Sequence, residues 1–276
     1  MKIRIVTDTA ADCFQEDITN LGIEIVELPV TFEGETEPCR DIDLFWKLLV
    51  SGRVARTSQP SPEVFRELFT DAKEHGDTLI YISISSNMSG TYANALAVKE
   101  QLGYENVYVV DSLNATTAEK MLVLTACKLR DQGASASEIV DKLNELKHRV
   151  KMHACIDSLK HLGIGGRISK AAAAIGSLIN IKPFITFVDG YVTPNGKTIG
   201  TTLAMHKLMD IVAKSNIDWD YAPISLYSMD AKNTLAFIKR ANERGIPIDE
   251  QYLTPIGSTI GTHLGPGGFG IVYVEK

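Results

Sequence analysis

The chain has 276 residues, of which 45% are hydrophobic and 22% charged, and its formal net charge at pH 7 is -6. A chain of this length and composition can bury a large core, and its length favours two domains over one. The acidic balance disfavours any partner that needs a broad basic face, so we expect no nucleic-acid binding and at most transient membrane contact.

The cysteines and the N-terminal residues indicate a cytoplasmic protein. The chain opens directly into a strand pattern at Lys2, without the apolar region and cleavage site of a signal peptide. Its longest apolar run, 171–181, is far shorter than a membrane span. The cysteines form no CxxC pair, so they predict buried thiols in a reducing compartment and neither a zinc site nor a redox pair: Cys13, Cys39, Cys127 and Cys155.

Short strand patterns alternate with helical patterns in the first half of the chain. Helix starts are marked by Ser61 followed by Pro62, by Thr116 with Glu119, and by Ser135 with Glu138, the last two pairs having the spacing of a capping box. Alternation of this kind predicts parallel βαβ units in a three-layer α/β domain. The expected strands are 2–7, 23–30, 78–84 and 107–110, and the expected helices are 41–49, 62–75, 92–102, 116–133 and 135–150.

The pattern changes after residue 150. Asp189-Gly190 predicts a tight hairpin turn between two short strands. Hairpins mixed with helices indicate a second, α+β domain with a mixed or antiparallel sheet, so we expect domains at 1–150 and 151–276. The expected strands are 152–156, 184–188, 191–193 and 224–228 with two more near the C-terminus, and the expected helices are 170–178, 201–215 and 231–245.

Polar residues follow three strands of the expected parallel sheet. Thr7-Asp8-Thr9 follows the first strand, Ser85 to Thr91 follows the strand from Thr78, and Asp111-Ser112 follows the strand from Val107. Ligands of such sheets bind at the carboxyl ends of the strands. Each turn alone is ordinary turn chemistry, but their expected convergence at one edge favours a binding site.

The turn from Ser85 to Tyr92 is crowded with hydroxyl groups at the start of a helix. Free NH groups and the positive end of the helix dipole bind anions there, so the turn is a candidate site for a negatively charged head group. The alternative is that Ser89 merely caps the helix, which this stretch alone favours.

Three other stretches offer groups for an anion. Thr57-Ser58-Gln59-Pro60-Ser61-Pro62 supplies hydroxyls on a stiff backbone, or is simply a proline-rich connection with a cap. Arg167 follows two glycines and can grip a carboxylate or phosphate, or make a surface ion pair. His263, in a glycine-rich run, can donate to an anion, act as an acid or base, or have no role.

Several signatures of enzymes are missing. The histidines have no HExxH spacing, so we expect no metal, and the chain has neither a GxSxG elbow nor a GxxxxGK[ST] loop. Gly265, Gly267 and Gly270 match GxGxxG, but a strand and the end of the chain follow, so we reject a dinucleotide site. We also expect no catalytic residue and no cofactor, since no base is evident for any of the serines.

Taken together, these motifs resemble the DegV family from one end of the chain to the other. They occur in family order: Thr7-Asp8-Thr9 with Asp12, Thr57-Ser58-Gln59-Pro60-Ser61-Pro62, Ser89-Gly90-Thr91-Tyr92, Asp111-Ser112, Gly165-Gly166-Arg167-Ile168, and Ile260-Gly261-Thr262-His263 with Gly265-Pro266-Gly267.

The resemblance implies a two-domain protein that binds a long-chain fatty acid between its domains, with the acyl chain in an apolar tunnel. It implies a carrier that presents the carboxylate to a separate, ATP-using fatty acid kinase subunit. The alternative is an enzyme that acts on a small acylated or phosphorylated substrate with His263 as acid or base. The residues implied for ligand binding are Thr57, Ser58, Ser61, Ser89, Gly90, Thr91, Arg167 and His263.

The chain departs from the family pattern after Asp111-Ser112. It has Leu113 to Glu119 where the family often has a small, glycine-containing run, and the early motif lacks the usual serine pair. Because a carboxylate near an anion is unfavourable, we expect Glu119 to face away from the ligand, or the pocket to differ there.

Overall fold

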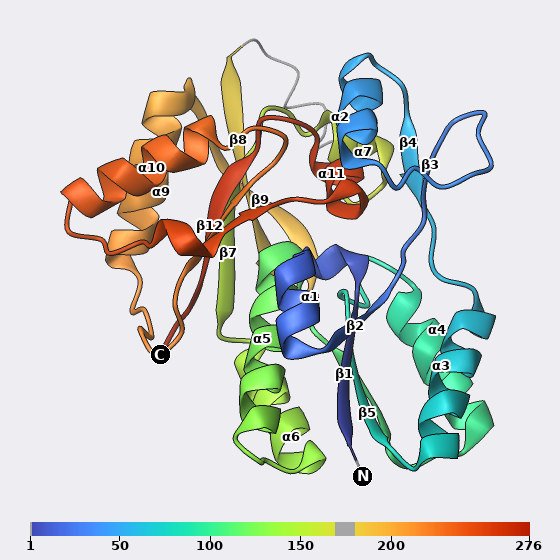
Figure 1. Cartoon of the computed structure of the whole chain (residues 1–276). Helices are drawn as coiled ribbons and strands as arrows, with labels where there is room; N and C mark the ends of the chain where they lie inside the picture. The colour runs from blue at the N-terminus through green and yellow to red at the C-terminus, as the bar shows by residue number, and fades with distance from the viewer. Residues whose placement is uncertain (1, 169–179) are drawn as a thin grey trace. The chain divides into compact units, whose positions relative to one another are not determined.

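The computed structural model describes residues 2–168 and 180–276 (Figure 1). It divides into two compact units. The first comprises residues 1–29 and 58–148, and the second comprises residues 30–57 and 149–276. The expected helix 170–178 lies outside the described residues.

The first unit is built on a parallel sheet in the order β2-β1-β5-β6. Its strands are β1 (Ile3–Asp8), β2 (Ile23–Val26), β5 (Thr78–Ser83) and β6 (Val107–Asp111). Every pair of neighbours runs parallel, and every residue of β5 is buried, as expected for a central strand with both faces covered. The predicted parallel sheet is confirmed.

Helices cover this sheet in the three-layer arrangement that the sequence predicts. Figure 1 shows α3 and α4 on one side of it and α5 and α6 on the other. The ring of Phe65 on α3 lies 5.2 Å from that of Tyr81 on β5, within a shared apolar cluster. The helices are η1 (Thr9–Ala11), α1 (Gln15–Leu21), α3 (Pro62–His75), α4 (Thr91–Leu102), α5 (Thr116–Asp131) and α6 (Ala136–Leu146).

The second unit contains a mixed six-stranded sheet in the order β11-β10-β12-β7-β8-β9. Only β10 and β11 run parallel among these strands, so the predicted mixed α+β architecture is confirmed. The strands are β7 (Val150–Cys155), β8 (Ile181–Val188), β9 (Tyr191–Ile199), β10 (Ile224–Tyr227), β11 (Leu253–Pro255) and β12 (Phe269–Val274).

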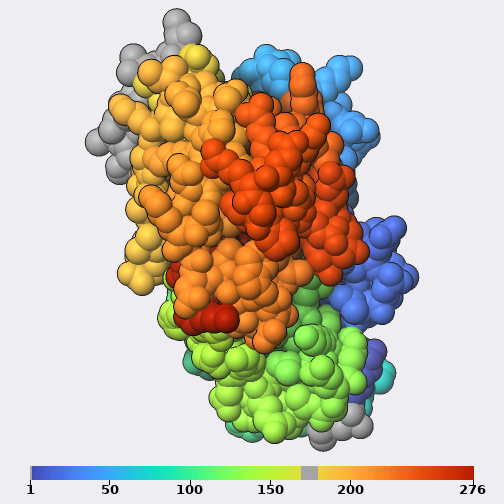
Figure 2. All heavy atoms as spheres, turned by 90° about the vertical axis from the view of Figure 1, so that its left-hand side faces the viewer, coloured from blue at the N-terminus to red at the C-terminus, as the bar shows by residue number. Residues whose placement is uncertain are grey.

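Helices α9 (Thr201–Lys214) and α10 (Lys232–Glu243) pack on one face of this sheet around a large apolar cluster. Figure 2 shows the part of the chain that contains both helices as an orange to orange-red surface. A second cluster joins α2 (Ile42–Val50) to the two-stranded sheet of β3 (Val30–Phe32) and β4 (Ala55–Thr57). Three short helices complete the described part of the unit: α7 (Lys160–Ile164), η2 (Glu250–Tyr252) and α11 (Ser258–Leu264).

Two local predictions are confirmed and two are wrong. Asp189 and Gly190 have φ of 48° and 80°, as a primed hairpin turn requires, and Ser135 forms its capping box with Glu138. The capping box predicted for Thr116 and Glu119 does not form, because Thr116 is already the first residue of α5. The single strand expected over 23–30 is two strands, β2 and β3, which belong to different units.

The structural units differ from the expected domains at 1–150 and 151–276 in the placement of residues 30–57. The chain leaves the first unit after Pro29 and returns at Ser58, and the intervening segment packs with residues 149–276. The residues that flank this segment are hydrogen-bonded to each other, since Ser58 N donates to the carbonyl oxygen of Pro29 at 3.0 Å. Among the described helices none is long and apolar enough to cross a membrane.

Candidate functional site

The three polar turns of the first unit do meet at one edge of the sheet. Asp8 accepts hydrogen bonds from the Tyr81 hydroxyl at 2.9 Å and from the backbone NH groups of Ala10 and Ile84, each at 3.0 Å. Asp111 accepts from the backbone NH of Ser86 at 3.1 Å. Because these carboxylates bind backbone groups of the turns, the edge is a hydrogen-bonded scaffold that positions the start of the next helix.

Burial dominates the electrostatics of Asp8. Its side chain is fully buried, and desolvation raises the pKa of the carboxyl to about 6 although its hydrogen bonds to backbone NH groups act to lower it.

Glu119 lies inside this scaffold. It is completely buried on α5, where one carboxyl oxygen is within hydrogen-bond distance of Thr7 Oγ1 at 3.1 Å. Thr116, three residues earlier, donates to Asp12 Oδ2 at 2.6 Å from a backbone with φ of 54°. A β-branched residue rarely adopts such a positive φ, so the backbone is strained at this turn.

The start of α4 differs in detail from the predicted cap. Gly90 is the N-cap residue, and Ser89 precedes it. Ser89 Oγ nevertheless accepts from the backbone NH of Thr91 at 3.3 Å and lies 2.8 Å from Thr91 Oγ1. Ser89 is partly exposed and Thr91 is buried, so the pair both satisfies a free NH of the helix start and presents a hydroxyl group at the surface.

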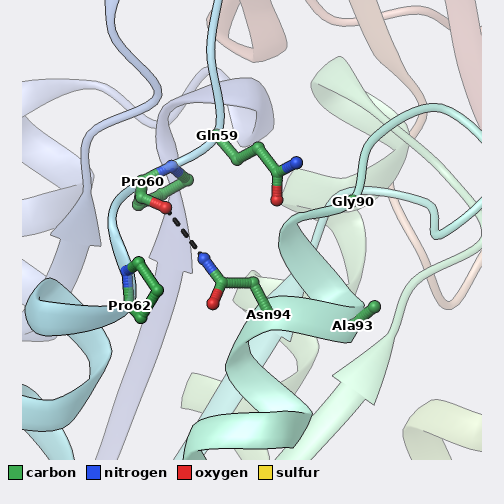
Figure 3. A pocket seen from close by; sticks show the side chains of 6 residues that line it. All are labelled: Gln59, Pro60, Pro62, Gly90, Ala93 and Asn94. Carbon is green, nitrogen blue, oxygen red and sulfur yellow. Dashed lines mark hydrogen bonds between the residues drawn. The ribbon is translucent and has the colours of Figure 1, made fainter.

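A groove of about 560 Å³ opens beside this helix start, lined by Gln59, Pro60, Pro62, Gly90, Ala93 and Asn94 (Figure 3). Asn94 Nδ2 donates to the carbonyl oxygen of Pro60 at 2.8 Å and so ties the proline-rich run to α4. Gln59 extends toward Gly90, where an added Cβ would lie 2.8 Å from Gln59 Nε2. Ser58 and Ser61 are exposed, and Ser61 occupies the N-cap position of α3 without a side-chain cap bond.

Thr57 and His263 meet in the second unit. Thr57 ends β4, and its Oγ1 lies 2.8 Å from His263 Nε2 on α11. The sequence singled out both residues but offered no means of pairing them. Gly261 allows α11 to pack closely against Trp46 of α2, because an added Cβ would lie 2.8 Å from the Trp46 ring.

His263 is enclosed on the opposite side of its ring. Its Nδ1 is buried without a hydrogen-bond partner among the described residues, and an added Cβ on Gly165 would lie 2.1 Å from this atom. Burial lowers the pKa of His263 to about 3, helped by the positive charge of Arg167. His263 is therefore a neutral imidazole at physiological pH.

Arg167 lies within the electrostatic reach of His263. Its Nη1 donates to the carbonyl oxygen of Gly165 at 2.6 Å, which fixes the guanidinium plane against the glycine turn. Desolvation lowers the pKa of Arg167, yet its guanidinium stays charged at neutral pH. The second unit thus brings a neutral histidine, a hydroxyl group and a cation close together.

Two residues, one in each unit, were not among the residues predicted to bind a ligand. His161 on α7 contributes to lowering the pKa of His263, and an added Cβ on Gly265 would lie 2.4 Å from its ring. Gln59 borders the groove beside α4. The positive φ of Gly265, 77°, gives a reason for a glycine there, but no spacing pattern points to His161. Within 2–168 and 180–276, no group of three or more His, Cys, Asp or Glu residues is arranged to hold a metal ion.

Known proteins are similar to this chain over almost its whole length. A family model described as "Uncharacterised protein, DegV family" matches residues 2–276. A DegV domain-containing protein of Caldanaerobacter subterraneus subsp. tengcongensis is 33% identical over 279 residues, which cover 100% of this chain and 99% of the relative.

Solved structures show the same fold. A DegV family protein from Thermus thermophilus, described by its fatty acid binding, superposes with a TM-score of 0.88 at 28% identity and full coverage of both chains. A stearic acid-binding protein from Eubacterium ventriosum superposes with a TM-score of 0.84 at 25% identity, covering 100% of this chain and 99% of the other. With the family model matched over almost its entire length, this chain belongs to the DegV family.

Proposed function

We propose that this protein binds a long-chain fatty acid and holds its carboxylate with hydroxyl groups, a neutral histidine and an arginine. The observation that carries the proposal is the contact of Thr57 Oγ1 with His263 Nε2 at 2.8 Å, beside Arg167. The fatty acid and stearic acid binding described for the Thermus and Eubacterium proteins supports the same ligand class.

The tautomer of His263 determines what Thr57 offers a ligand. When Nε2 carries the hydrogen, the imidazole donates to Thr57 Oγ1 and leaves the hydroxyl hydrogen to donate to a carboxylate oxygen. The buried Nδ1 is then a bare acceptor, and unpaired buried acceptors are tolerated more readily than unpaired buried NH groups. This tautomer therefore suits anion binding.

In the first unit, the proposed ligand groups are those of the α4 start and the proline-rich run. Ser89, Gly90 and Thr91 offer hydroxyl and NH groups at the positive end of a 12-residue helix. Ser58 and Ser61 add exposed hydroxyls. We propose that these residues of the first unit also offer hydrogen bonds to an anionic ligand, because a carboxylate removed from water must be hydrogen-bonded or paired.

Extraction of the purified protein tests the proposal. Denaturation should release a fatty acid that mass spectrometry identifies. Each methylene of its chain that is buried in the protein should contribute about 0.8 kcal/mol to the binding free energy. Ser89→Ala and Arg167→Ala should reduce fatty acid binding more than they reduce stability. Protein that is repeatedly free of lipid, and that also ignores added fatty acids, contradicts the proposal.

We further propose that the protein is a cytoplasmic carrier that presents the carboxylate to a separate, ATP-using fatty acid kinase subunit. Its four cysteines are free thiols, which supports a reducing compartment. The sequence lacks the GxxxxGK[ST] loop for nucleotide phosphates. Acyl phosphate should form only when the kinase, ATP and loaded protein are combined; an unchanged rate with free fatty acid and no carrier contradicts the partnership.

His263 is a poor acid or base for the alternative enzymatic function. With a pKa of about 3 it is not present as an imidazolium that could act as a general acid at neutral pH, and it is too weak a base to take a proton. Turnover of an acyl phosphate by this protein alone, lost in His263→Ala, would reverse this assignment.

A further inference from the structure

The buried carboxyl of Glu119 lacks the partners that an ionised side chain needs. Glu119 is 0% exposed on α5. Its Oε1 lies 3.1 Å from Thr7 Oγ1, and its Oε2 is buried without a hydrogen-bond partner among the described residues. A buried carboxylate with one unsatisfied oxygen is costly, whereas the carbonyl oxygen of a neutral acid tolerates this position better.

Thr7 has one hydroxyl hydrogen for two oxygen neighbours. Thr7 Oγ1 lies 2.9 Å from the carbonyl oxygen of Ile82 and 3.1 Å from Glu119 Oε1. The carbonyl can only accept, so the shorter contact takes the hydroxyl hydrogen. The contact with Glu119 is then attractive only if the carboxyl group supplies a hydrogen of its own.

Among the described residues, the charged groups around Glu119 do not neutralise a carboxylate. Those acting on it are acidic: Asp8 from β1, Asp12 after η1 and Asp111 from β6. Tyr81 of β5 and Cys13 also face it and would become negative on ionisation. On α5 itself, Lys120 pairs with Asp17 at 2.5 Å and lies over the Phe14 ring. Lys147, after α6, acts on Asp111.

Asp8 and Glu119 are neighbouring carboxyl groups with different hydrogen-bond partners. Asp8 receives three hydrogen bonds from NH and OH donors, whereas Glu119 has, among the described residues, only the contact with Thr7. Donors stabilise an ionised carboxylate, and an ionised neighbour keeps a second carboxyl protonated. Burial, followed by the charge of Asp8, raises the pKa of Glu119 well above its ordinary value.

We propose that Glu119 is a neutral carboxylic acid in the folded protein at neutral pH, that it donates its hydrogen to Thr7 Oγ1, and that this bond is a pH-sensitive latch between α5 and β1. When the proton leaves to solvent, the latch loses its hydrogen and a carboxylate remains beside Asp8. The latch joins α5 to the carboxyl end of β1, the edge that carries the polar turns of the first unit.

Glu119→Gln provides the variant test, because an amide has nearly the same shape, cannot ionise and can donate to Thr7. The urea midpoint of the wild-type protein should fall relative to that of the variant as the pH rises from 5.5 to 8.5, because the folded state holds a proton that the unfolded state releases. Glu100→Gln, an exposed change on α4, should follow the wild-type profile. Parallel profiles for wild type and Glu119→Gln would overturn the proposal.

A second test uses only the wild-type protein, so it does not depend on whether a variant folds. Calorimetric unfolding at pH 7.5, in buffers of different ionisation enthalpy, counts the protons exchanged. At this pH, Asp8 is already ionised, so a protonated Glu119 predicts release of about one proton per chain. Unfolding without net proton release shows that Glu119 is ionised in the folded protein and refutes the latch.

Discussion

Thr57 and His263 are 206 positions apart in the sequence, yet Thr57 Oγ1 lies 2.8 Å from His263 Nε2. The contact joins the end of β4 to α11 within the second unit. Both side chains are partly buried, so the hydrogen bond is shielded from competing water. Changes at either residue, or at the glycine that encloses the imidazole, should therefore be measurable.

Thr57→Val should weaken fatty acid binding without unfolding the protein. Valine keeps the shape of the side chain but removes the hydroxyl that we propose donates to the carboxylate. Loss of one hydrogen bond to a charged group costs about 1.5–3 kcal/mol, or about a tenfold to hundredfold rise in Kd. Titration with a fluorescent fatty acid measures the change.

Thr36→Val is the matched control for this variant, because Thr36 is exposed on the same unit. It should bind the fluorescent fatty acid as the wild-type protein does. Equal affinities for Thr57→Val and wild type would remove Thr57 from the proposed site.

The depressed pKa of His263 predicts loss of stability in acid. In the unfolded chain this histidine binds a proton near pH 6.5, whereas in the folded protein it does so only near pH 3. The unfolded state therefore binds more protons between these values, and the free energy of unfolding should fall with pH by at most about 1.4 kcal/mol per unit. His263→Gln should flatten this dependence in urea titrations between pH 4 and 6.5.

His75→Gln is the comparison for the acid titration. His75 is exposed beside Asp71, and its pKa is raised by the Asp71 backbone carbonyl and carboxylate, so its contribution has the opposite sign. Removing it should not flatten the acid dependence. An unchanged slope in His263→Gln would show that the folded protein accepts a proton at this position.

Gly165→Ala should disturb the histidine directly. The added Cβ would lie 2.1 Å from His263 Nδ1, on a turn whose backbone also accepts from Arg167. Relief requires movement of the ring or of the turn, so we expect a loss of about 1–3 kcal/mol in stability together with weaker ligand binding. Chemical denaturation measures the loss of stability, and a histidine NMR spectrum reports the movement of the ring.

Gly90→Ala gives a contrast in stability at a glycine of the other unit. The three atoms nearest to its added Cβ all belong to the side chain of Gln59, which is exposed and can swing away. We therefore expect a smaller cost than at Gly165. Equal costs at the two positions would mean that His263 is free to move.

The sequence predicted the layers of the fold because alternation and helix caps are local signals. Capping of α6 at Ser135 and the hairpin turn at Asp189 depend on neighbouring residues, and both form. Thr116 shows the limit of this reasoning. It has the spacing of a cap, but its hydroxyl is recruited by Asp12, more than a hundred positions away. A tertiary hydrogen bond replaced the local one.

The candidate site was predictable in composition but not in pairing. Glycines next to Arg167 and His263 indicated close approach, without showing that Gly165 would close on the imidazole. Likewise, the burial of Glu119 was not predictable, because no local pattern shows that the first turn of α5 lies inside the scaffold. Short helices such as α7 and α11 were also missed, since a single turn or two carries little periodicity.

Asp8→Asn should destabilise the first unit through the scaffold at the strand ends. Asp8 accepts from two backbone NH groups and the Tyr81 hydroxyl, and an asparagine would turn an NH₂ group toward at least one of these donors. The resulting unsatisfied buried group should cost about 1–3 kcal/mol.

Burial raises the pKa of Asp8 to about 6, so the wild-type free energy of unfolding should fall as the pH rises from 3.8 to 6, and the variant should lack this contribution. Urea unfolding across this range, with the exposed change Asp141→Asn as control, measures both effects. A variant as stable as the wild-type protein at pH 7 would show that the carboxylate does not hold these turns together.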